Sequence, residues 1–448
     1  MDTAVRGPIR RLPTELLAET FLHYVAEGLN SSPVELPIPP TLILCQICSN
    51  WRHFVYATPK LWVNFSLDID YASGDDGSFA KAWTKAWLSR ARPYPLNVSL
   101  LVNTPTKALN GIVDAILSDA DRLQVIELRF PLSHFQPLVN VAAGSMALLE
   151  RVNLSVVPYY GSVIGPWGRK LTAFATAPRL RSVTLCSTDL LDFNIQFPWS
   201  QLTELYIGEA SNALSTCRNA LLQCTNLVDC TLHMHLEAFT PAVPIVVLPR
   251  LKKLNVAFEG LAHDSLPFFQ PLNLPALKDL TVSRCPWSQQ IFMEFTSRSS
   301  FDLERLRFNF VKIRPDELLQ VLPHMQSLVE LEVQLSQCVN DSLFNALCYR
   351  KTDSQHLVPQ LKILNIRASS DDIDDNGIAN MIESRWWTDD APHMVSRFEI
   401  VILSIDGRKI DVWARERVEH CRREGLALCL DQPDMWVRSQ FLQRYKKE

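Results

Sequence analysis

Acidic residues near the end of the sequence have the spacing of a calcium-binding loop. The run DIDDNG at residues 372–377, followed by Glu383 at the twelfth position, fits the oxygen ligands and the turn glycine of an EF-hand loop. An EF-hand loop needs a helix before it, whereas residues 361–366 have the pattern of a strand. We therefore expect Asp374 or Asp375 to cap a helix that follows. Calcium binding by this loop is the alternative.

Two further groups of residues could bind a metal ion. Cys45, Cys48 and His53 supply three potential ligands, but a structural zinc site needs four. We expect both thiols to be buried, because residues three apart share one face of a helix. His233 and His235 alternate on a predicted strand with no third ligand assigned, so we expect exposed side chains. The sequence thus predicts neither a metal nor a cofactor.

Motifs typical of enzymes do not occur in this sequence. It has no Gly-x-Ser-x-Gly elbow, no glycine-rich phosphate loop and no His-Glu-x-x-His motif. Hydrophobic residues make up 47% and charged residues 21%, as in folded proteins, and a net charge of -4 gives no general attraction to nucleic acids or anionic membranes. We therefore predict that the protein is not an enzyme and has no nucleic acid or membrane partner.

The strongest internal pattern is a repeat of the phrase Leu-x-x-apolar-x-apolar. Successive copies begin 22 to 33 residues apart, which is close to the unit length of leucine-rich repeats. The last two apolar positions are two residues apart and so share one face of a short strand. The copies occupy residues 123–128, 149–154, 180–185, 202–207, 227–232, 251–256, 277–282, 303–308, 328–333 and 361–366. Ten parallel strands are predicted.

Several intervals between these phrases have helical periodicity. Apolar residues follow a helical face over residues 109–117 and 213–221, the second after a possible Ser211 cap, and Pro315 is placed to begin a third helix. Residues 186–200 and 234–248 contain prolines or lack this period, so irregular connections are expected there. The array is thus predicted to be α/β, with parallel strands on one face and helices and irregular connections on the other.

The first part of the chain lacks the repeat phrase and has the pattern of short amphipathic helices. Pro13 is placed to open one helix, a proline-rich link ends at Pro40, and a second helix is expected over residues 42–56. The amino-acid sequence of residues 9–21, 44–52 and 58–62 resembles the F-box, and specifically the large F-box and leucine-rich-repeat families of mushroom-forming fungi. In detail these stretches read IRRLPTELLAETF, LCQICSNWR and TPKLW, and residues 79–100 resemble the stretch that follows the box in those proteins.

This resemblance implies a small all-α F-box that binds a Skp-type adaptor and, through it, a cullin-RING ubiquitin ligase. The repeat solenoid would then hold an unknown target protein, so the chain would be the substrate-recognition subunit of an SCF-type ligase. The implied adaptor contacts are Leu12, Pro13, Leu16, Phe21, Leu44, Ile47 and Trp51. The alternative for these residues is that they pack onto the first repeats.

The outward positions of the predicted strands form a candidate surface for the target. Side chains that alternate with the buried ones point away from the core, so one ligand could contact several strands at once. These positions hold Glu127, Arg129, Asn153, Tyr206, Thr231, His233, Asn255, Thr281, Arg307, Glu332, Asn365 and Arg367. A leucine-rich-repeat scaffold or inhibitor with no link to ubiquitin is the alternative function, because a repeat array alone permits it.

These patterns divide the sequence into four parts. We expect a tail at residues 1–8, an F-box-like helical domain at 9–65, a connecting segment at 66–95 and the solenoid with its cap at 96–448. Eleven scattered cysteines do not suggest a disulfide framework, and the first residues contain no apolar signal segment. A cytoplasmic or nuclear location is expected.

Overall fold

A computed structural model shows helices that alternate with parallel strands, which confirms the predicted α/β class. The chain divides into two compact units, Met1–Pro198 and Trp199–Glu448. In the described part of the chain, no helix has the length and apolar character needed to cross a membrane. The described residues are 12–30, 38–69, 78–103, 109–157, 170–186, 195–235, 244–259, 268–285, 287–334, 338–352, 355–368, 373–387, 395–405 and 409–431.

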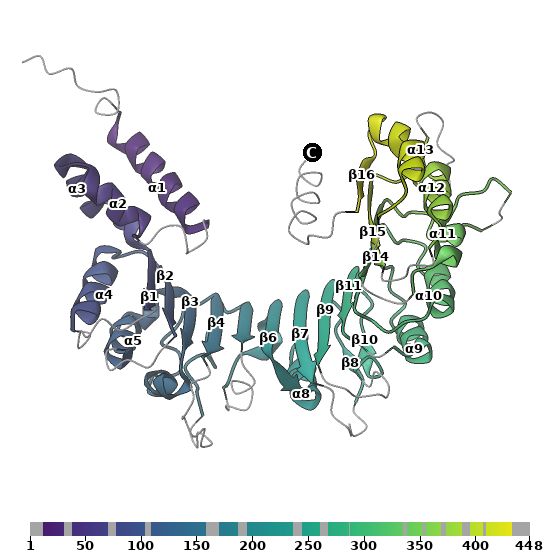
Figure 1. Ribbon diagram of the computed structural model, residues 1–448. Helices are drawn as coiled ribbons and strands as arrows, with labels where there is room; N and C mark the ends of the chain where they lie inside the picture. Colours follow the sequence, from purple (N-terminus) through teal and green to yellow (C-terminus); the bar gives the residue numbers. More distant parts are fainter. Residues whose placement is uncertain are drawn as a thin grey trace, which may run out of the picture. The chain divides into compact units, whose positions relative to one another are not determined.

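The first unit begins with a small helical module (Figure 1). It contains helices α1 (Thr14–Asn30), α2 (Pro40–Ile47) and α3 (Ser49–Tyr56), followed by the turn η2 (Pro59–Trp62). The single helix predicted over residues 42–56 is wrong, because Cys48 adopts an extended conformation between α2 and α3. Ser49 and Asn50 favour a helix start over a helix interior, which explains the break. Residues 1–11 and 31–37 of the predicted tail, box and link lie outside the described residues.

The rest of the first unit is a parallel sheet whose strands follow one another in chain order. It begins at Asn64, so part of the segment predicted to connect the box and the repeats is itself sheet and helix. The strands are β1 (Asn64–Ile69), β2 (Leu96–Val102), β3 (Leu123–Phe130), β4 (Arg151–Val156) and β5 (Ser182–Cys186). Between them lie α4 (Ser78–Arg90), α5 (Leu109–Leu117), η3 (Ala120–Arg122), η4 (Leu132–Phe135) and α6 (Gln136–Val139).

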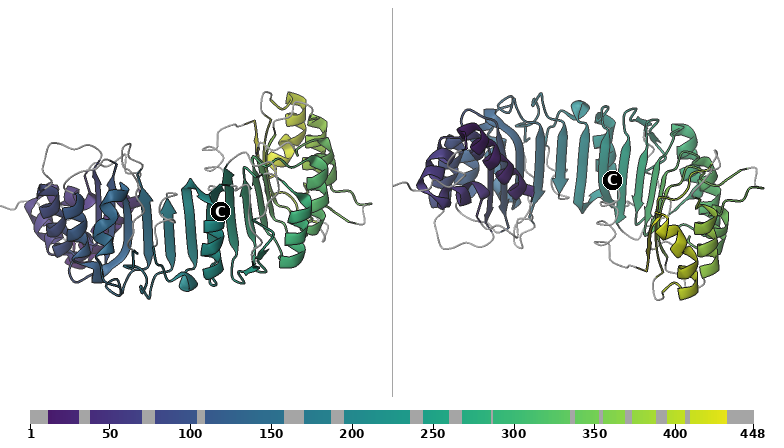
Figure 2. Two further views of the ribbon diagram at one scale, coloured as in Figure 1. Left: turned by 90° about the horizontal axis from the view of Figure 1, so that it is seen from below. Right: turned by 90° about the horizontal axis from the view of Figure 1, so that it is seen from above.

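The second unit has the same arrangement of parallel strands in chain order, with helices α9 to α13 along one side of them (Figures 1 and 2). The strands are β6 (Glu204–Ala213), β7 (Asp229–His235), β9 (Lys253–Glu259), β11 (Asp279–Ser283), β12 (Arg305–Asn309), β13 (Glu330–Gln334), β14 (Ile363–Ala368), β15 (Ile400–Ile405) and β16 (Ala427–Leu430). Two short strands, β8 (Val246–Val247) and β10 (Leu272–Asn273), pair separately. The helices are α8 (Leu214–Gln223), α9 (Gln289–Ser299), α10 (Pro315–Val321), α11 (Asp341–Leu347), α12 (Asp375–Ser384) and α13 (Val412–Arg423), and η5 (Trp199–Gln201) and η6 (Leu322–His324) are short turns.

Each of the ten repeat phrases contains a strand, as predicted. The helices expected at residues 109–117 and from Pro315 are also present. The Ser211 cap is wrong, because β6 runs to Ala213 and α8 follows it directly. Of the connections predicted to be irregular, residues 187–194 and 236–243 lie outside the described residues.

The core of the second unit is built from equivalent apolar positions on neighbouring strands. Leu280 is paired in register with Leu254 on one side and Leu306 on the other, and all three are buried. Thr281, one residue along, points to the opposite face and is partly exposed. The alternation predicted from the phrase therefore holds at this strand.

Replacing Leu280 by alanine should lower the free energy of unfolding by about 3 kcal/mol, because it removes buried contacts and leaves a cavity. The matched change Thr281→Ala should alter that free energy by less than about 0.5 kcal/mol. Urea unfolding of the two variants measures both values. Equal destabilisation would mean that the assignment of inward and outward strand positions is wrong.

Candidate protein-binding surfaces

The helical module has an aromatic core of its own. Phe21 is only 2% exposed, and its ring centroid lies 4.5 Å from that of Trp51 and 5.7 Å from that of Phe54. Leu44 is buried as well. Phe21 and Leu44 were predicted as adaptor contacts, but the structure places them inside the module, and Trp51 is partly buried against Phe21. These three residues hold the helices together, because aromatic rings bury large apolar areas.

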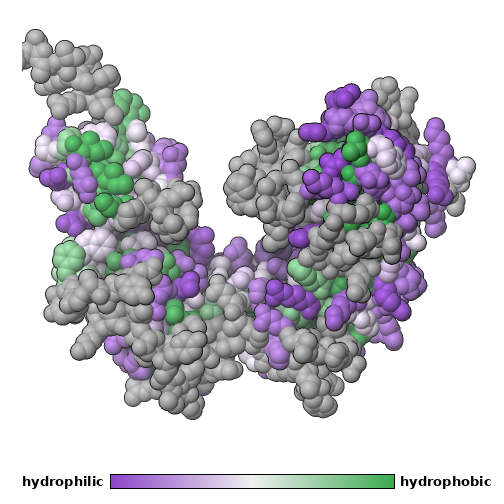
Figure 3. All heavy atoms as spheres, viewed as in Figure 1, coloured by the Kyte–Doolittle hydropathy of each residue, from purple (hydrophilic) through white to green (hydrophobic). Residues whose placement is uncertain are grey.

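The other predicted adaptor contacts lie on the surface of this module. Leu12, Pro13, Leu16 and Ile47 are exposed, and Leu16 has 54% of its surface accessible. Figure 3 shows hydrophobic residues gathered over these helices. Tyr24, which the sequence analysis missed, is a further exposed apolar residue on α1. Its spacing of eight residues from Leu16 places it near the same helix face, and this spacing could have identified it.

In the first unit, the outward strand positions are joined by hydrogen bonds across strands. Ser99 on β2 donates to one carboxylate oxygen of Glu127 at 2.8 Å, and Asn153 on β4 donates to the other at 3.1 Å. Glu127 is thus held between its two neighbours, whereas Arg129 on the same strand is exposed. Among the predicted contacts of this unit, Arg129 has the side chain most accessible to a partner.

The outward positions of β6 to β11 are polar and mostly partly exposed. The rings of Tyr206 and His233 lie 5.8 Å apart, and Lys253 pairs with Asp229 at 2.9 Å. Thr231, Asn255 and Thr281 continue this surface on β7, β9 and β11, and each is partly exposed. These side chains form a polar surface that spans four strands, as predicted.

Further along the same face, Arg307 lies at the centre of an ion-pair network. Its guanidinium contacts Asp279 at 2.7 Å on β11, and Glu330 at 3.0 Å and Glu332 at 3.9 Å on β13. Arg305 pairs with the other oxygen of Asp279 at 2.8 Å. The side chains of Asp279 and Glu330 are almost fully buried. The outward positions are therefore not independent solvated residues here, and they form a connected layer of charges.

Burial raises the pKa of Glu332 above its ordinary value, and the attraction of Arg307 only partly offsets this effect. The Glu332 carboxyl group therefore stays protonated to a higher pH in the folded protein than in the unfolded chain. The free energy of unfolding consequently falls as pH rises from the ordinary carboxyl pKa through the raised one. The charged form of Glu332 is the destabilising form.

The variant Glu332→Gln, which mimics the protonated carboxyl group, should therefore be more stable than the wild type at pH 7. The difference should narrow as pH falls towards about 4, where the wild-type carboxyl group also becomes protonated. Urea unfolding at the two pH values measures this difference, and Glu204→Gln on an exposed strand position is the control. A variant that is less stable than the wild type at pH 7 would contradict the prediction.

The last two predicted target contacts differ in accessibility. Arg367 is partly exposed, but Asn365 is only 2% exposed and cannot contact a partner in this structure. In register, Asn365 lies between Glu332 on β13 and Ile402 on β15. Its inclusion in the target surface is wrong, because this outward position is buried, which strand alternation alone does not reveal.

The calcium pattern of the sequence falls on the start of a helix, as expected. Asp374 caps α12 by accepting a hydrogen bond from the backbone N–H of Asn376, and Glu383 pairs with Arg417 on α13. Glu383 lies nine positions after Asp374, about 13 Å along the helix axis, so their carboxylates do not converge on one position. Asp372 lies outside the described residues.

The predicted pair of buried thiols is only half right. Cys45 is buried, but Cys48 is partly exposed and accepts a hydrogen bond from the N–H of Trp51 at 3.5 Å. On the repeat strands, His233 is partly exposed and His235 is exposed. Within the described ranges, no group of three or more histidine, cysteine and acidic side chains is placed to hold a metal ion.

The buried cysteines are poor nucleophiles in this structure. Burial raises the pKa of Cys224 and Cys338 to about 12, and those of Cys230 and Cys285 well above the ordinary value. Since the thiolate is the nucleophilic form, these four side chains stay protonated at neutral pH. They act as small apolar residues of the core.

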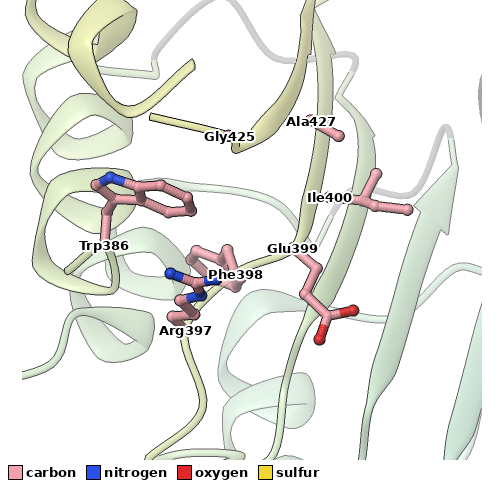
Figure 4. Close-up of a pocket in the computed structure, with 7 residues that line it drawn as sticks. All are labelled: Trp386, Arg397, Phe398, Glu399, Ile400, Gly425 and Ala427. Carbon is pink, nitrogen blue, oxygen red and sulfur yellow. The ribbon is translucent and has the colours of Figure 1, made fainter. Parts of the chain in front are cut away.

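A hollow of about 190 Å³ lies beside the starts of β15 and β16 (Figure 4). Its polar groups already have partners: the guanidinium of Arg397 stacks 5.2 Å from the ring of Trp386, the Trp386 indole donates to Glu424 at 2.8 Å, and Glu399 pairs with Lys362 at 2.9 Å. Phe398, Ile400, Gly425 and Ala427 complete the lining. None of the predicted binding residues lines this hollow.

Comparisons with known proteins add no assignment to these surfaces. No model of a protein family matches the sequence, and a search of curated proteins finds no match. The function must therefore be inferred from the two surfaces themselves.

Proposed function

We propose that this protein is the substrate-recognition subunit of an SCF-type (Skp-cullin-F-box) ubiquitin ligase. In this proposal the helical module α1–α3 binds a Skp-type adaptor, and the outward strand face holds a target protein. The chain itself performs no bond chemistry and acts by holding the target near the ligase.

The observation that carries the proposal is the exposed apolar group Leu12, Leu16 and Ile47 on a small module. The module does not need these side chains for its own core, because Phe21 and Leu44 already fill it. Several large apolar residues left exposed on a small helical module favour a surface for a protein partner. Residues 9–62 resemble an F-box, and this resemblance implies that the partner is a Skp-type adaptor protein.

The strand faces support the second half of the proposal. Arg129, Tyr206, Thr231, His233, Asn255 and Thr281 point away from the core and offer hydrogen-bonding and aromatic groups at regular spacing. A stacked array can present such groups over an extended surface to a folded target. The same surface would also serve a scaffold or inhibitor with no link to ubiquitin, so adaptor binding is the property that separates the two functions.

The change Leu16→Asp should weaken adaptor binding at least about 30-fold, because it places a charge in the centre of a buried apolar contact. The fold should be unaffected, since Leu16 is exposed in the free protein. Calorimetric titration with a purified Skp-type adaptor measures the affinity. The matched control is Val412→Asp, the same kind of change at an exposed residue of α13. If the two variants bound the adaptor with equal affinity, α1 would not be part of the adaptor-binding surface.

A further inference from the structure

An exposed aromatic residue lies at the carboxyl end of a strand in the large sheet of the second unit. Phe310 directly follows β12 and has 50% of its surface accessible. The other large apolar residues exposed in the described part of this unit lie on α8, on α13, or on and beside β8. They are Leu222, Ile245, Val247, Val412 and Trp413. Phe310 is therefore the one that adjoins the outward face of the large sheet.

The backbone of Phe310 turns its side chain out of the core. Its φ is 57°, in the left-handed region. In a continued strand Phe310 would point inward, as Phe308 does. The left-handed turn instead exposes Phe310 and buries Val311, which is 1% exposed. Arg284 repeats this geometry after β11, with a φ of 52° and with Cys285 buried behind it.

This conformation is unfavourable for a phenylalanine. A left-handed backbone is strained for a bulky residue, whereas glycine and asparagine adopt it readily. Val358 shares the conformation but is buried, so core packing holds it there. A single exposed apolar residue needs no explanation, but Phe310 is both exposed and strained. Its side chain favours neither the backbone conformation nor the exposed surface, and backbone strain of this kind is typical of functional sites.

Two cationic side chains lie near Phe310. Arg284 and Phe310 follow paired residues of β11 and β12, so they lie side by side. The Arg284 side chain is 64% exposed, and its guanidinium is 3.9 Å from the carboxylate of Glu259. Lys312 is exposed as well, and its N–H donates to the carbonyl of Cys285 at 3.4 Å. These side chains bring two positive charges and one negative charge to the ends of the strands.

We propose that Arg284, Phe310 and Lys312, here called the strand-end site, bind an acidic segment of the target protein. The segment carries one large apolar side chain, which buries against the Phe310 ring, with aspartate and glutamate residues around it. Aromatic residues are enriched in protein interfaces, and complementary charges add specificity. This inference deepens the proposed function and rests on it, because the strand-end site extends the target surface beyond Thr281 and Arg307.

Peptide selection tests the proposal. The purified full chain selects binders from a phage-displayed library of random dodecapeptides, and these should combine an aromatic or aliphatic residue with aspartate and glutamate. The most frequent peptide is then labelled with fluorescein and titrated by fluorescence polarisation. Phe310→Asn should weaken its binding at least about 30-fold, and Arg284→Gln at least about 3-fold. The matched control Val412→Asn, at an exposed apolar residue of α13, should bind as the wild type does.

Urea unfolding of Phe310→Asn separates a binding role from a structural one. Asparagine adopts the left-handed conformation readily, so the urea midpoint of this variant should equal or exceed that of the wild type. A lower midpoint, selected peptides without acidic residues, or peptide binding that Phe310→Asn leaves unchanged would each overturn the proposal. A wild-type dimer in analytical ultracentrifugation that Phe310→Asn converts to a monomer would also overturn it, because the strand-end site would then join two copies of this chain.

Adaptor binding is measured separately on the same variant. Phe310 lies in the second unit and helices α1–α3 lie in the first, so Phe310→Asn should bind a Skp-type adaptor with wild-type affinity. Failure of the peptide result with normal adaptor binding would overturn the strand-end site alone. Absence of adaptor binding in a wild-type chain that binds the peptide as described would overturn only the link to a ubiquitin ligase.

Discussion

Replacing Arg385 by methionine should lower the free energy of unfolding by more than about 4 kcal/mol. Arg385 is 1% exposed and donates hydrogen bonds to three backbone carbonyls, those of Leu347 at 2.8 Å, Val358 at 3.2 Å and Leu357 at 2.6 Å. Methionine would fill the space but leave these acceptors buried and unpaired, at about 1 to 3 kcal/mol each. Burial lowers the pKa of Arg385 to about 10, so it remains charged at neutral pH and its hydrogen bonds are charge-assisted.

The control for this prediction is Arg397→Met. Arg385 stacks 5.5 Å from the ring of Phe398, and Arg397 likewise stacks on the ring of Trp386, but Arg397 is exposed to solvent. Its replacement should change the free energy of unfolding by less than about 1 kcal/mol. Urea unfolding of both variants at pH 7 gives the comparison. If Arg385→Met and Arg397→Met lowered the free energy of unfolding equally, the hydrogen bonds from Arg385 would not be a major source of stability.

Replacing Arg307 by methionine should cost about 3 to 5 kcal/mol of unfolding free energy. The change leaves Asp279 and Glu330 buried without their central cation, and removing one member of a buried ion-pair network is far more costly than removing an exposed one. An effect of this size means that target binding by this variant cannot be interpreted without a stability measurement. We therefore expect the main role of Arg307 to be the stabilisation of the fold.

Lys253→Met is the matched control for Arg307. Lys253 also occupies an outward strand position and pairs with a carboxylate, Asp229, but both side chains are at least 40% exposed. Ion pairs of that kind contribute about 0 to 1 kcal/mol. Thermal and urea unfolding should thus separate the two variants clearly. Similar stability of both would show that the network around Arg307 does not stabilise the fold.

The strands of this protein could be predicted from its sequence wherever the leading leucine of the phrase is present. Four more strands of the large sheet lack the full phrase. Trp62, Phe398 and Gly425 occupy the position of the leading leucine before β1, β15 and β16, and in β2 a shift in register follows Leu96, which is paired with the leading Leu123 of β3. Trp62 and Phe398 fill the same buried space with a larger side chain, so the packing is kept although the phrase is lost. The pattern identifies leucine, whereas the fold requires only a buried residue of suitable shape.

The binding surfaces were predicted less well than the strands. Strand alternation correctly placed residues such as Thr281 and Arg129 on the outward face. It could not show that Asn365 is buried or that Arg307 is surrounded by carboxylates, because alternation along one strand does not indicate which groups lie around a side chain in the folded protein. Likewise, helical periodicity does not distinguish Phe21, which packs inside the module, from Leu16, which is exposed.

The most direct test of the proposed function is calorimetric titration of the full chain with a purified Skp-type adaptor. We expect one-to-one binding with a Kd below about 1 μM. No detectable binding at adaptor concentrations of about 100 μM would contradict the proposal and would favour a repeat scaffold with no link to a ubiquitin ligase.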